Sequence, residues 1–312
     1  MSNIDFPWLR RIYVSFDGAG GGIYQSDGTQ RQARIIARVE KTIQGIPNAT
    51  SLTLYNLSEN TRSSFQRGKT KVTIKAGWDE GPFKGLKQCF KGTLATAASQ
   101  RAGADIVTSI TAISAIDDLN LTTVDKTWLP GYPVAEIVKE LADMLPGVTV
   151  DRNRIKYIEN YIATGAWSHK GTVRTALDHL SREFGFSWNI ADQHFQACKD
   201  LKSFGGGTVV KSPYLIDVNP VFTGQGMMQM VKGLRIRCTF NATVNPLFNV
   251  SVESEVEKRF NGGAYIMHTV VHNLDCWNAA SFVTEINAVA DPASATMKNV
   301  NQLARAGLAA PA

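Results

Sequence analysis

A strand-like stretch of eight residues occurs twice in this chain, and the two copies lie 176 positions apart. Residues 106–113 (IVTSITAI) align with residues 282–289 (FVTEINAV), and four aligned positions are identical: Val107 and Val283, Thr108 and Thr284, Ile110 and Ile286, and Ala112 and Ala288. The same separation places Ile74 on Val250, Ala76 on Val252 and Leu94 on Val270 without a gap. A register kept over three strands predicts that one β unit is present twice in the chain.

The first third of the chain has the pattern of strands joined by turns. Apolar and polar residues alternate, as a sheet with one buried face requires, in segments 11–16, 34–40, 51–57 and 71–78. Segments 90–97 and 105–113 predict two more strands with a turn at 101–103, and segment 58–65 predicts a short capped helix. Six or seven strands in about 115 residues predict a small barrel or a sandwich.

The middle of the chain changes to helical patterns and the last third returns to strands. Helices are predicted at 133–145 and 172–184, followed by a hairpin of strands 186–190 and 194–199. Four further strands are predicted at 233–240, 247–255, 264–272 and 280–289. The Ala-rich end, 291–312, is expected to be mobile or weakly helical. The sequence therefore predicts an α/β insert between two copies of a β domain.

The chain has 312 residues and a formal charge of +6, and the positive excess lies in its first third. Residues 1–115 contain 15 Lys and Arg against 8 Asp and Glu, and the remainder contains 18 against 19. This bias fits contact with nucleic acid or an acidic protein surface, or an exposed face of a β domain. The basic residues alternate with apolar ones and never form a run of five, which favours the exposed strand face.

Neither a membrane-spanning helix nor a signal peptide is expected. No apolar run reaches the roughly 18 residues that a spanning helix needs, and the N-terminal MSNIDFPWLRRIY lacks an apolar core. The cysteines lie far apart without a CxxC pair, which predicts free, buried thiols at Cys89, Cys198, Cys238 and Cys276. The chain is therefore expected to fold in a cytoplasm.

Two glycine-rich stretches do not have the context of a phosphate-binding loop. Such a loop needs a strand before it and a helix after it, with Lys-Ser/Thr in the P-loop form. Residues 18–22 (GAGGG) precede a strand-like segment and predict a hairpin tip. Residues 204–207 (FGGG) predict a linker between the insert and the second β domain.

No catalytic, cofactor or metal site is predicted. His268 and His272 have the spacing of a helical chelate, but on a strand they would lie about 13 Å apart. Hydrolysis of a glycosidic bond needs two carboxylates that lie about 5–10 Å apart in one cleft. Carboxylate pairs are present at Asp117–Asp118 and at Glu253 and Glu255, but the sequence does not show that either pair lies in a cleft. We therefore predict a protein that is not an enzyme and holds no cofactor.

The residues around position 50 resemble the opening of phage baseplate hub proteins. The matching segments are 47–58 (PNATSLTLYNLS), 61–62 and 72–78 (VTIKAGW), followed by 90–92 (FKG). Segments 233–238, 245–246 and 263–272 are similar to that family's second strand set, and segment 277–289 is similar to its closing strand pair. The residues that carry the resemblance, all with expected structural roles, are Asn48, Asn56, Leu57, Ser58, Arg62, Gly77, Gly92, Tyr265 and His272. Residues 222–228 (FTGQGMM) depart from the Gly-Leu-x-Gly-x-Pro-like stretch of related proteins.

The resemblance implies a β-rich α+β fold with two tail-tube-like β-barrel domains in one chain and an inserted α/β domain. The implied boundaries are 1–116 for the first barrel, 117–207 for the insert, 208–290 for the second barrel and 291–312 for a C-terminal tail. Three chains would then give six barrels in a pseudo-sixfold ring. Such a structural hub would join the sixfold tail tube to the threefold central spike and leave a channel for DNA ejection.

The implied partners are two further copies of the chain, the tail tube protein and the central spike protein. Tape measure, baseplate wedge and sheath proteins are further candidates. DNA would pass through the channel without sequence-specific binding, since strong phosphate contacts would retard it. The implied location is the tail baseplate of a virion that assembles in the host cytoplasm. The basic first third would then face a protein neighbour, with Arg34 and Arg38 as residues to test.

Two other classes of function stay open at this point. A tail-associated enzyme that degrades cell wall or carbohydrate would need a clustered acid pair in the insert. A β-rich nucleic-acid-binding module would need salt-sensitive DNA binding by residues 1–115.

Overall fold

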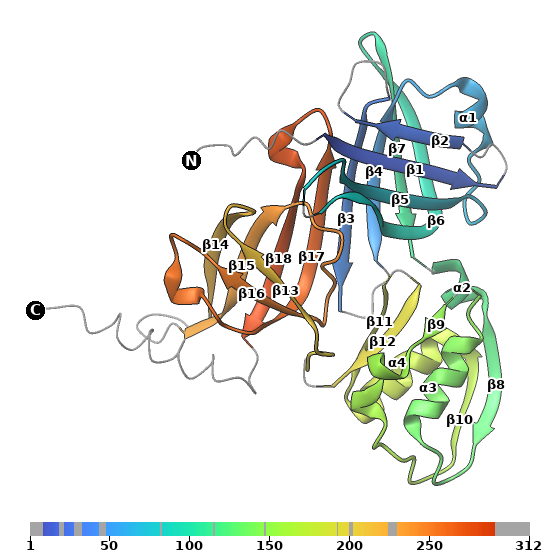
Figure 1. Cartoon of the computed structure of the whole chain (residues 1–312). Coiled ribbons are helices and arrows are strands. Elements are labelled where there is room, and N and C mark those ends of the chain that lie inside the picture. The colour runs from blue at the N-terminus through green and yellow to red at the C-terminus, as the bar shows by residue number, and fades with distance from the viewer. Residues whose placement is uncertain are drawn as a thin grey trace, which may run out of the picture.

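The computed structural model describes residues 9–18, 22–27, 33–43, 48–81, 83–114, 116–146, 148–191, 193–199, 202–223 and 230–290. Figure 1 shows two β-rich parts side by side, with a smaller part that contains helices below the first. We call strands β1–β7 the first half, strands β13–β18 the second half, and the elements between them the insert. The expected C-terminal tail, the centre of the glycine-rich stretch 18–22 and residues 224–228 of the departing segment lie outside the described residues.

The strands and helices follow one another in three blocks. The first half comprises β1 Arg10–Asp17, β2 Gly22–Ser26, β3 Ile35–Thr42, β4 Ala49–Tyr55, α1 Glu59–Ser64, β5 Lys71–Trp78, β6 Gly85–Ala102 and β7 Asp105–Ile113. The insert comprises α2 Ile116–Leu121, β8 Thr123–Trp128, α3 Val134–Asp143, β9 Thr149–Val150, β10 Trp167–Thr172, α4 Val173–Phe184, β11 Ser187–Ala191 and β12 His194–Cys198. The second half comprises β13 Gly207–Lys211, β14 Leu215–Thr223, β15 Met230–Thr239, β16 Asn249–Glu253, β17 Tyr265–Asp275 and β18 Val283–Ala290.

One sheet of 13 strands runs through both halves. Its main path is β14-β15-β18-β17-β3-β4-β7-β6-β5-β1-β2, and β16 joins β17 to β13 beside this path. The halves meet where β3 pairs antiparallel with β17 from Ile36–Asp275 to Thr42–Thr269. Among the described strands, no pairing joins β2 to β3 or β13 to β14. The β-rich fold is therefore confirmed, but the expectation of closed barrels is wrong for these strands, because the two ends of each half do not pair.

The two halves repeat one strand order. The first half reads β3-β4-β7-β6-β5-β1, and the second reads β14-β15-β18-β17-β16-β13 at the same places. Both copies have a β-bulge at the matching position, between Leu94 and Thr96 in β6 and between Met267 and Thr269 in β17. The last pair differs, since β1 is antiparallel to β5 whereas β13 is parallel to β16.

The single offset of 176 residues holds for β7 and β18 but not for the other strands. Ile110 pairs with Ala97 and Ile286 pairs with Val270, so β17 follows β6 by 173 positions. The reason is the loop after β17, which is three residues longer than its counterpart after β6. Likewise Val250 corresponds to Val72, not to Ile74, because the β16–β17 connection is shorter. The predicted alignments of Ile74, Ala76 and Leu94 are therefore wrong by two or three residues.

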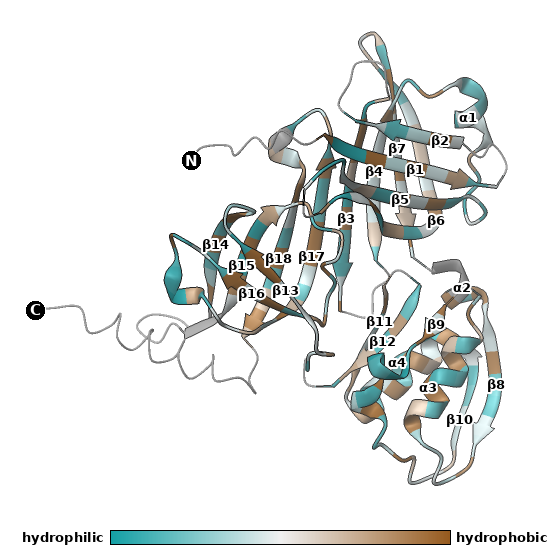
Figure 2. Cartoon of the chain, in the orientation of Figure 1, coloured by the Kyte–Doolittle hydropathy of each residue, from teal (hydrophilic) through white to brown (hydrophobic). Residues whose placement is uncertain are grey.

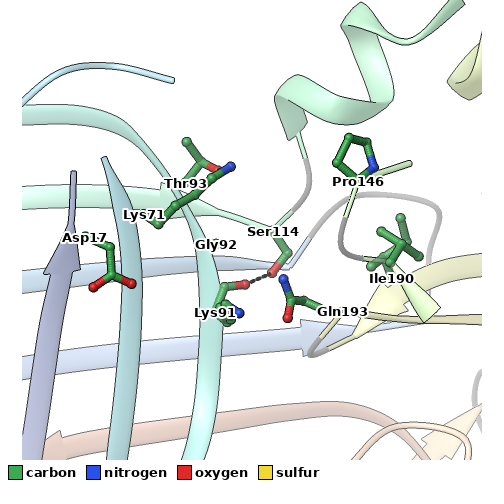
Figure 3. Close-up of a pocket in the computed structure, with 10 residues that line it drawn as sticks. Asp17, Lys71, Lys91, Gly92, Thr93, Ser114, Pro146, Ile190 and Gln193 are labelled. Atoms are coloured by element: carbon green, nitrogen blue, oxygen red, sulfur yellow. Dashed lines mark hydrogen bonds between the residues drawn. The ribbon is translucent and has the colours of Figure 1, made fainter. Parts of the chain in front are cut away.

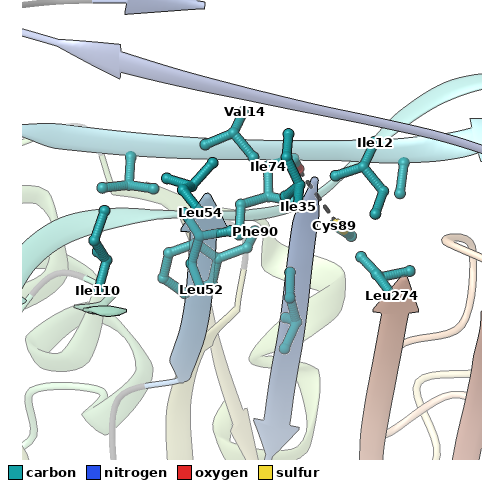
Figure 4. Close-up of a cluster of buried hydrophobic side chains, with 14 of the residues drawn as sticks. Ile12, Val14, Ile35, Leu52, Leu54, Ile74, Cys89, Phe90, Ile110 and Leu274 are labelled. Carbon is teal, nitrogen blue, oxygen red and sulfur yellow. Dashed lines mark hydrogen bonds between the residues drawn. The ribbon is translucent and has the colours of Figure 1, made fainter. Parts of the chain in front are cut away.

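The core of the first half extends into the second. Side chains from all the major strands of the first half pack together, including Ile12, Leu52, Ile74 and Phe90 (Figure 4). Phe240, Leu274, Cys276 and Phe282 of the second half belong to the same cluster. Figure 2 shows hydrophobic residues on β17, β18 and β3, the strands that meet between the halves. Apolar burial of about 25 cal/mol per Å² makes this shared core a strong link between the halves.

The insert has a core of its own around α3 and α4. Val134, Ile137, Val138 and Leu141 bury one face of α3, as the spacing predicts. Thr172 caps the start of α4, and Gly185 ends it in the left-handed conformation that favours glycine. No helix among the described residues has the length and apolarity needed to cross a membrane.

Candidate functional site

Four residues of the sequence motif build one corner after β4. Asn56 has a positive φ of 55°, and its side chain donates to Asp105 Oδ1 at 2.8 Å and accepts from the Ile106 amide at 2.9 Å. The Ser58 hydroxyl accepts from the Thr61 amide and so caps α1. Arg62 Nε donates to the Leu57 carbonyl at 3.1 Å, while the Leu57 side chain is buried in the core. The corner therefore fixes the path of the chain from β4 to α1.

Gly77 and Gly92 stand where another backbone comes too close for any side chain. A Cβ on Gly77 would lie 1.9 Å from the Gly85 carbonyl oxygen. A Cβ on Gly92 would lie 2.6 Å from the Phe90 ring and 2.7 Å from the Ile113 carbonyl oxygen. Both positions thus require glycine for the approach of neighbouring strands.

Asn48 connects the first half to the insert. Its Oδ1 accepts from the Thr42 amide at 3.2 Å, and its Nδ2 donates to the Ile190 carbonyl at 3.2 Å. Asn189 Nδ2 donates in turn to the Thr42 carbonyl at 2.5 Å. These bonds tie β11 of the insert to the ends of β3 and β4, and Asn48 is buried among them.

The seam between the halves, which we define as the β3–β17 pairing and the residues that flank it, holds several polar contacts. Lys41 is almost fully buried and its Nζ donates to Asn245 Oδ1 at 2.8 Å. Arg34 pairs with Asp275 at 3.3 Å and lies over the Tyr55 ring. Trp78 Nε1 donates to the Phe240 carbonyl at 3.0 Å. The seam is therefore specified by charge and hydrogen bonding as well as by its apolar core.

Arg34 and Arg38, the two arginines that the sequence singled out for testing, differ in their surroundings. The guanidinium of Arg34 forms an ion pair with Asp275 inside the seam. Arg38 pairs with Glu40 at 3.0 Å and keeps a side chain that is 55% exposed. Arg38 is thus the better of the two for testing an external protein contact.

Tyr265 and His272 lie on β17 and are buried. His272 Nδ1 lies 2.9 Å from Thr284 Oγ1 on β18, and its Nε2 has no hydrogen-bond partner among the described residues. Burial lowers the pKa of His272 well below its usual value, and nearby Lys41 lowers it further. Burial raises the pKa of Tyr265. The motif residues therefore do not converge on one site; they support the corner, two close strand approaches, the insert contact and the second half.

A pocket of about 340 Å³ lies between the first half and the insert (Figure 3). Its described lining contains one carboxylate, Asp17, and no histidine. Ser114 Oγ donates to the Lys91 carbonyl at 3.1 Å, and Lys71 Nζ donates to Thr93 Oγ1 at 3.0 Å. The described lining thus offers no pair of carboxylates of the kind that cleaves a glycosidic bond.

The insert contains a cluster around the carboxylate of Glu140 that the sequence did not indicate. Glu140 accepts from Lys126 Nζ at 2.5 Å, from Trp128 Nε1 at 2.9 Å and from the Tyr132 hydroxyl at 2.6 Å. Partial burial raises the pKa of Glu140, but the three hydrogen bonds outweigh it and hold that pKa below its usual value of 4.5. A glycosidase acid needs a raised pKa, so this cluster fits a structural role.

Glu140→Ala is expected to lower the free energy of unfolding of the protein at pH 7 by about 2 kcal/mol, since it leaves partly buried donors without an acceptor. The lowered pKa means that this stabilisation is complete above pH 4.5 and is lost as the pH falls through the folded-state pKa. Urea unfolding followed by tryptophan fluorescence at pH 7 and at pH 3.5 measures both effects. Glu159→Ala, at an exposed position in the same insert, is the control. Equal unfolding midpoints for the two variants at pH 7 would contradict the structural role.

The described residues form neither a metal site nor a carboxylate pair in a cleft at the other positions that the sequence suggested. The described residues contain no group of three His, Cys, Asp or Glu side chains that could hold a metal ion. Glu253 and Glu255 are exposed, and the side chains of Asp117 and Asp118 lie outside the described residues. The four cysteines are free and buried, as predicted.

Comparison with known proteins gives matches to structures alone. No protein-family model matches the chain, and no curated protein sequence matches it. The 43 kDa tail protein of prophage MuSo2 from Shewanella oneidensis is 11% identical with a TM-score of 0.58, over 89% of this chain and 96% of that chain. A tail protein from Neisseria meningitidis MC58 is 11% identical with a TM-score of 0.58, over 93% and 99%.

A third match comes from a secretion system. The E. coli c3393 protein is 9% identical with a TM-score of 0.56, over 86% of this chain and 78% of that chain. It is described as a component of the type VI secretion system with structural similarity to the T4 bacteriophage tail proteins gp27 and gp5. The chain therefore has the fold of phage tail proteins, and the resemblance seen in the sequence is confirmed at the level of the fold.

Proposed function

We propose that this chain is the structural baseplate hub of a contractile phage tail or of a related injection particle. The observation that carries the proposal is the strand order that occurs twice in one chain. Two similar but unequal β units per chain let three chains supply six units, which matches a sixfold tube on one side and a threefold spike on the other. The shared fold with phage tail proteins supports the same assignment.

We propose the division into residues 1–116, 117–207 and 208–290 for the two β units and the insert between them. Three hydrophobic clusters of the described residues support it, one in each block, although the first also takes in four buried side chains from the second half. A fourth cluster lies where the three blocks meet and comprises Ile43, Cys198, Phe204 and Leu247. In this proposal the motif residues, from Asn48 to His272, are structural and none is catalytic. They hold each β unit in the shape that the ring requires.

The proposed partners are two further copies of the chain, the tail tube protein and the central spike protein. Tape measure, wedge or sheath proteins would contact the outer surface or the channel. The ring would belong to the virion tail and assemble in the host cytoplasm, with DNA passing through a central channel. Arg38, which is exposed on β3, is the residue of the basic first third that we would expect to face a protein neighbour.

Native mass and negative-stain images of the purified protein test the proposal. Three chains of 34.1 kDa give a ring of about 102 kDa with a central hole. A monomer would be measured again after co-expression with the spike protein, since the spike can close the ring. A chain that stays monomeric with the spike present would overturn the proposed function.

A further inference from the structure

Several strand edges of the sheet lack a partner among the described strands, including one edge each of β2 and β13, and two others, on β14 and β6, occupy places that the internal repeat relates to a pairing already made. β14 pairs with β15 on one side and lies at one end of the sheet path. β6 pairs with β7 up to Ala102, but its pairing with β5 ends at Thr93. Leu94 still forms backbone hydrogen bonds with residues 68 and 70. After it, at residues 96–102, the outer edge of β6 has no described strand beside it. All seven residues of this segment are exposed.

The internal repeat says what these two edges correspond to. Residues that pair with one another across neighbouring strands form a row, and one such row of the first half consists of Ala37, Leu52, Ile110 and Ala97. The matching row of the second half runs through Val218, Ile236, Ile286 and Val270. β14 therefore stands where β3 stands, and β6 from Ala97 onward stands where β17 stands from Val270 onward.

The strands at these matching places are already paired inside the chain. β3 of the first half adds to the outer edge of β17 of the second half, with Glu40 opposite Val271. The corresponding pair, β14 of the second half and β6 of the first half, is unmade within one chain. In Figure 1, β14 lies at the left of the second half and β6 at the right of the first half, so the two strands are well separated within one chain.

We propose that β14 of one chain pairs antiparallel with residues 96–102 of β6 in the next chain and so repeats the β3–β17 pairing between chains. The register follows from the repeat and places Val221 opposite Ala98. This inference rests on the proposed ring. Around that ring, the β3–β17 pairing within each chain would alternate with the β14–β6 pairing between chains, and such head-to-tail contacts can close a ring.

The composition of both edges fits pairing with another strand. Residues 96–102 of β6 (TAASQRA) contain no proline or aromatic residue, and Arg101 is their one charged residue, although exposed edges usually carry several such groups to prevent pairing. On β14, Ile216 and Val221 are 47% and 41% exposed. Pro220 removes one donor from the β14 edge, which disfavours indiscriminate pairing but leaves its other donors available.

A disulfide between chains tests the register. In the proposed pairing, Val221→Cys and Ala98→Cys come within the 4.4–6.8 Å between Cα atoms that a disulfide allows. The control combines Val221→Cys with Ser109→Cys, because exposed Ser109 pairs with Ala98 one strand further in, roughly 10 Å away from the neighbour. The four native cysteines are buried, so they do not compete for the oxidant.

The concentrated double-cysteine proteins are oxidised and separated on a non-reducing denaturing gel, with the native mass measured in parallel. We expect covalent dimers and trimers from the Val221–Ala98 pair at about five times the yield of the control or more. A native trimer without this cross-link overturns the proposed pairing and leaves the ring standing. Cross-linked chains longer than three keep the pairing and overturn the ring. Protein that neither cross-links nor associates overturns both.

Discussion

Replacing Gly77 by alanine is expected to lower the free energy of unfolding of the protein by about 3 kcal/mol, because the new methyl group has no room. Its Cβ would lie 1.9 Å from the Gly85 carbonyl oxygen and 2.7 Å from the Gly85 carbonyl carbon. Both are backbone atoms, so no side chain can rotate away. Relief requires β5 and β6 to separate next to the Gly77–Leu86 pair.

Gly165→Ala is the matched control. A Cβ at Gly165 meets nothing within 4 Å, and such a substitution is expected to change stability by about 0.5 kcal/mol or less. Urea unfolding of the wild type and both variants at pH 7 compares them directly. If Gly77→Ala unfolds at the same urea concentration as Gly165→Ala, the close approach of the two strands is not a constraint on the fold.

Local patterns in the sequence predicted most elements that bury one face. The segments at 11–16, 71–78 and 105–113 became β1, β5 and β7, and the helices predicted at 58–65, 133–145 and 172–184 became α1, α3 and α4. The signal in each is alternation or helical spacing, which depends only on near neighbours. The missed parts lack it: β14 contains Pro220, and the outer part of β6 is an exposed run of small and polar residues.

The alignment of the two β units shows a second limit of the sequence. The identity between β7 and β18 was real, but loop lengths shift the neighbouring strands by two or three positions. Alternating strands match one another at many offsets, so only the pairings themselves fix the register. Barrel closure likewise depends on pairing between distant strands, which no local pattern encodes.

In the candidate site, too, local contacts could be predicted from the sequence and contacts between distant residues could not. The capping role of Ser58 is local and was predictable from its position before a helical turn. Glu140, by contrast, meets Lys126, Trp128 and Tyr132 only after β8 and α3 fold together. Trp78 and the Phe240 carbonyl are 162 residues apart in sequence, and no spacing rule connects them.

Trp78→Ala is expected to lower the free energy of unfolding by about 4 kcal/mol, because it empties a site in the core that the two halves share. The Trp78 side chain is 4% exposed, and its ring lies 5.0 Å from the Phe282 ring in an edge-to-face contact. Its Nε1 also provides the hydrogen bond to the Phe240 carbonyl. The substitution therefore removes packing and leaves a buried carbonyl without this donor.

Trp78→Phe separates these two contributions. It keeps an aromatic ring against Phe282 but removes the donor, for an expected loss of about 1–2 kcal/mol. Trp277→Phe is the control, because this side chain is 43% exposed and lies at the rim of the seam. Urea unfolding, followed by circular dichroism because the substitutions alter tryptophan fluorescence, should rank the variants as Trp277→Phe, Trp78→Phe and Trp78→Ala in decreasing stability. If Trp78→Ala matches Trp277→Phe, Trp78 does not join the halves, and the link comes from the β3–β17 pairing and the other contacts of the seam.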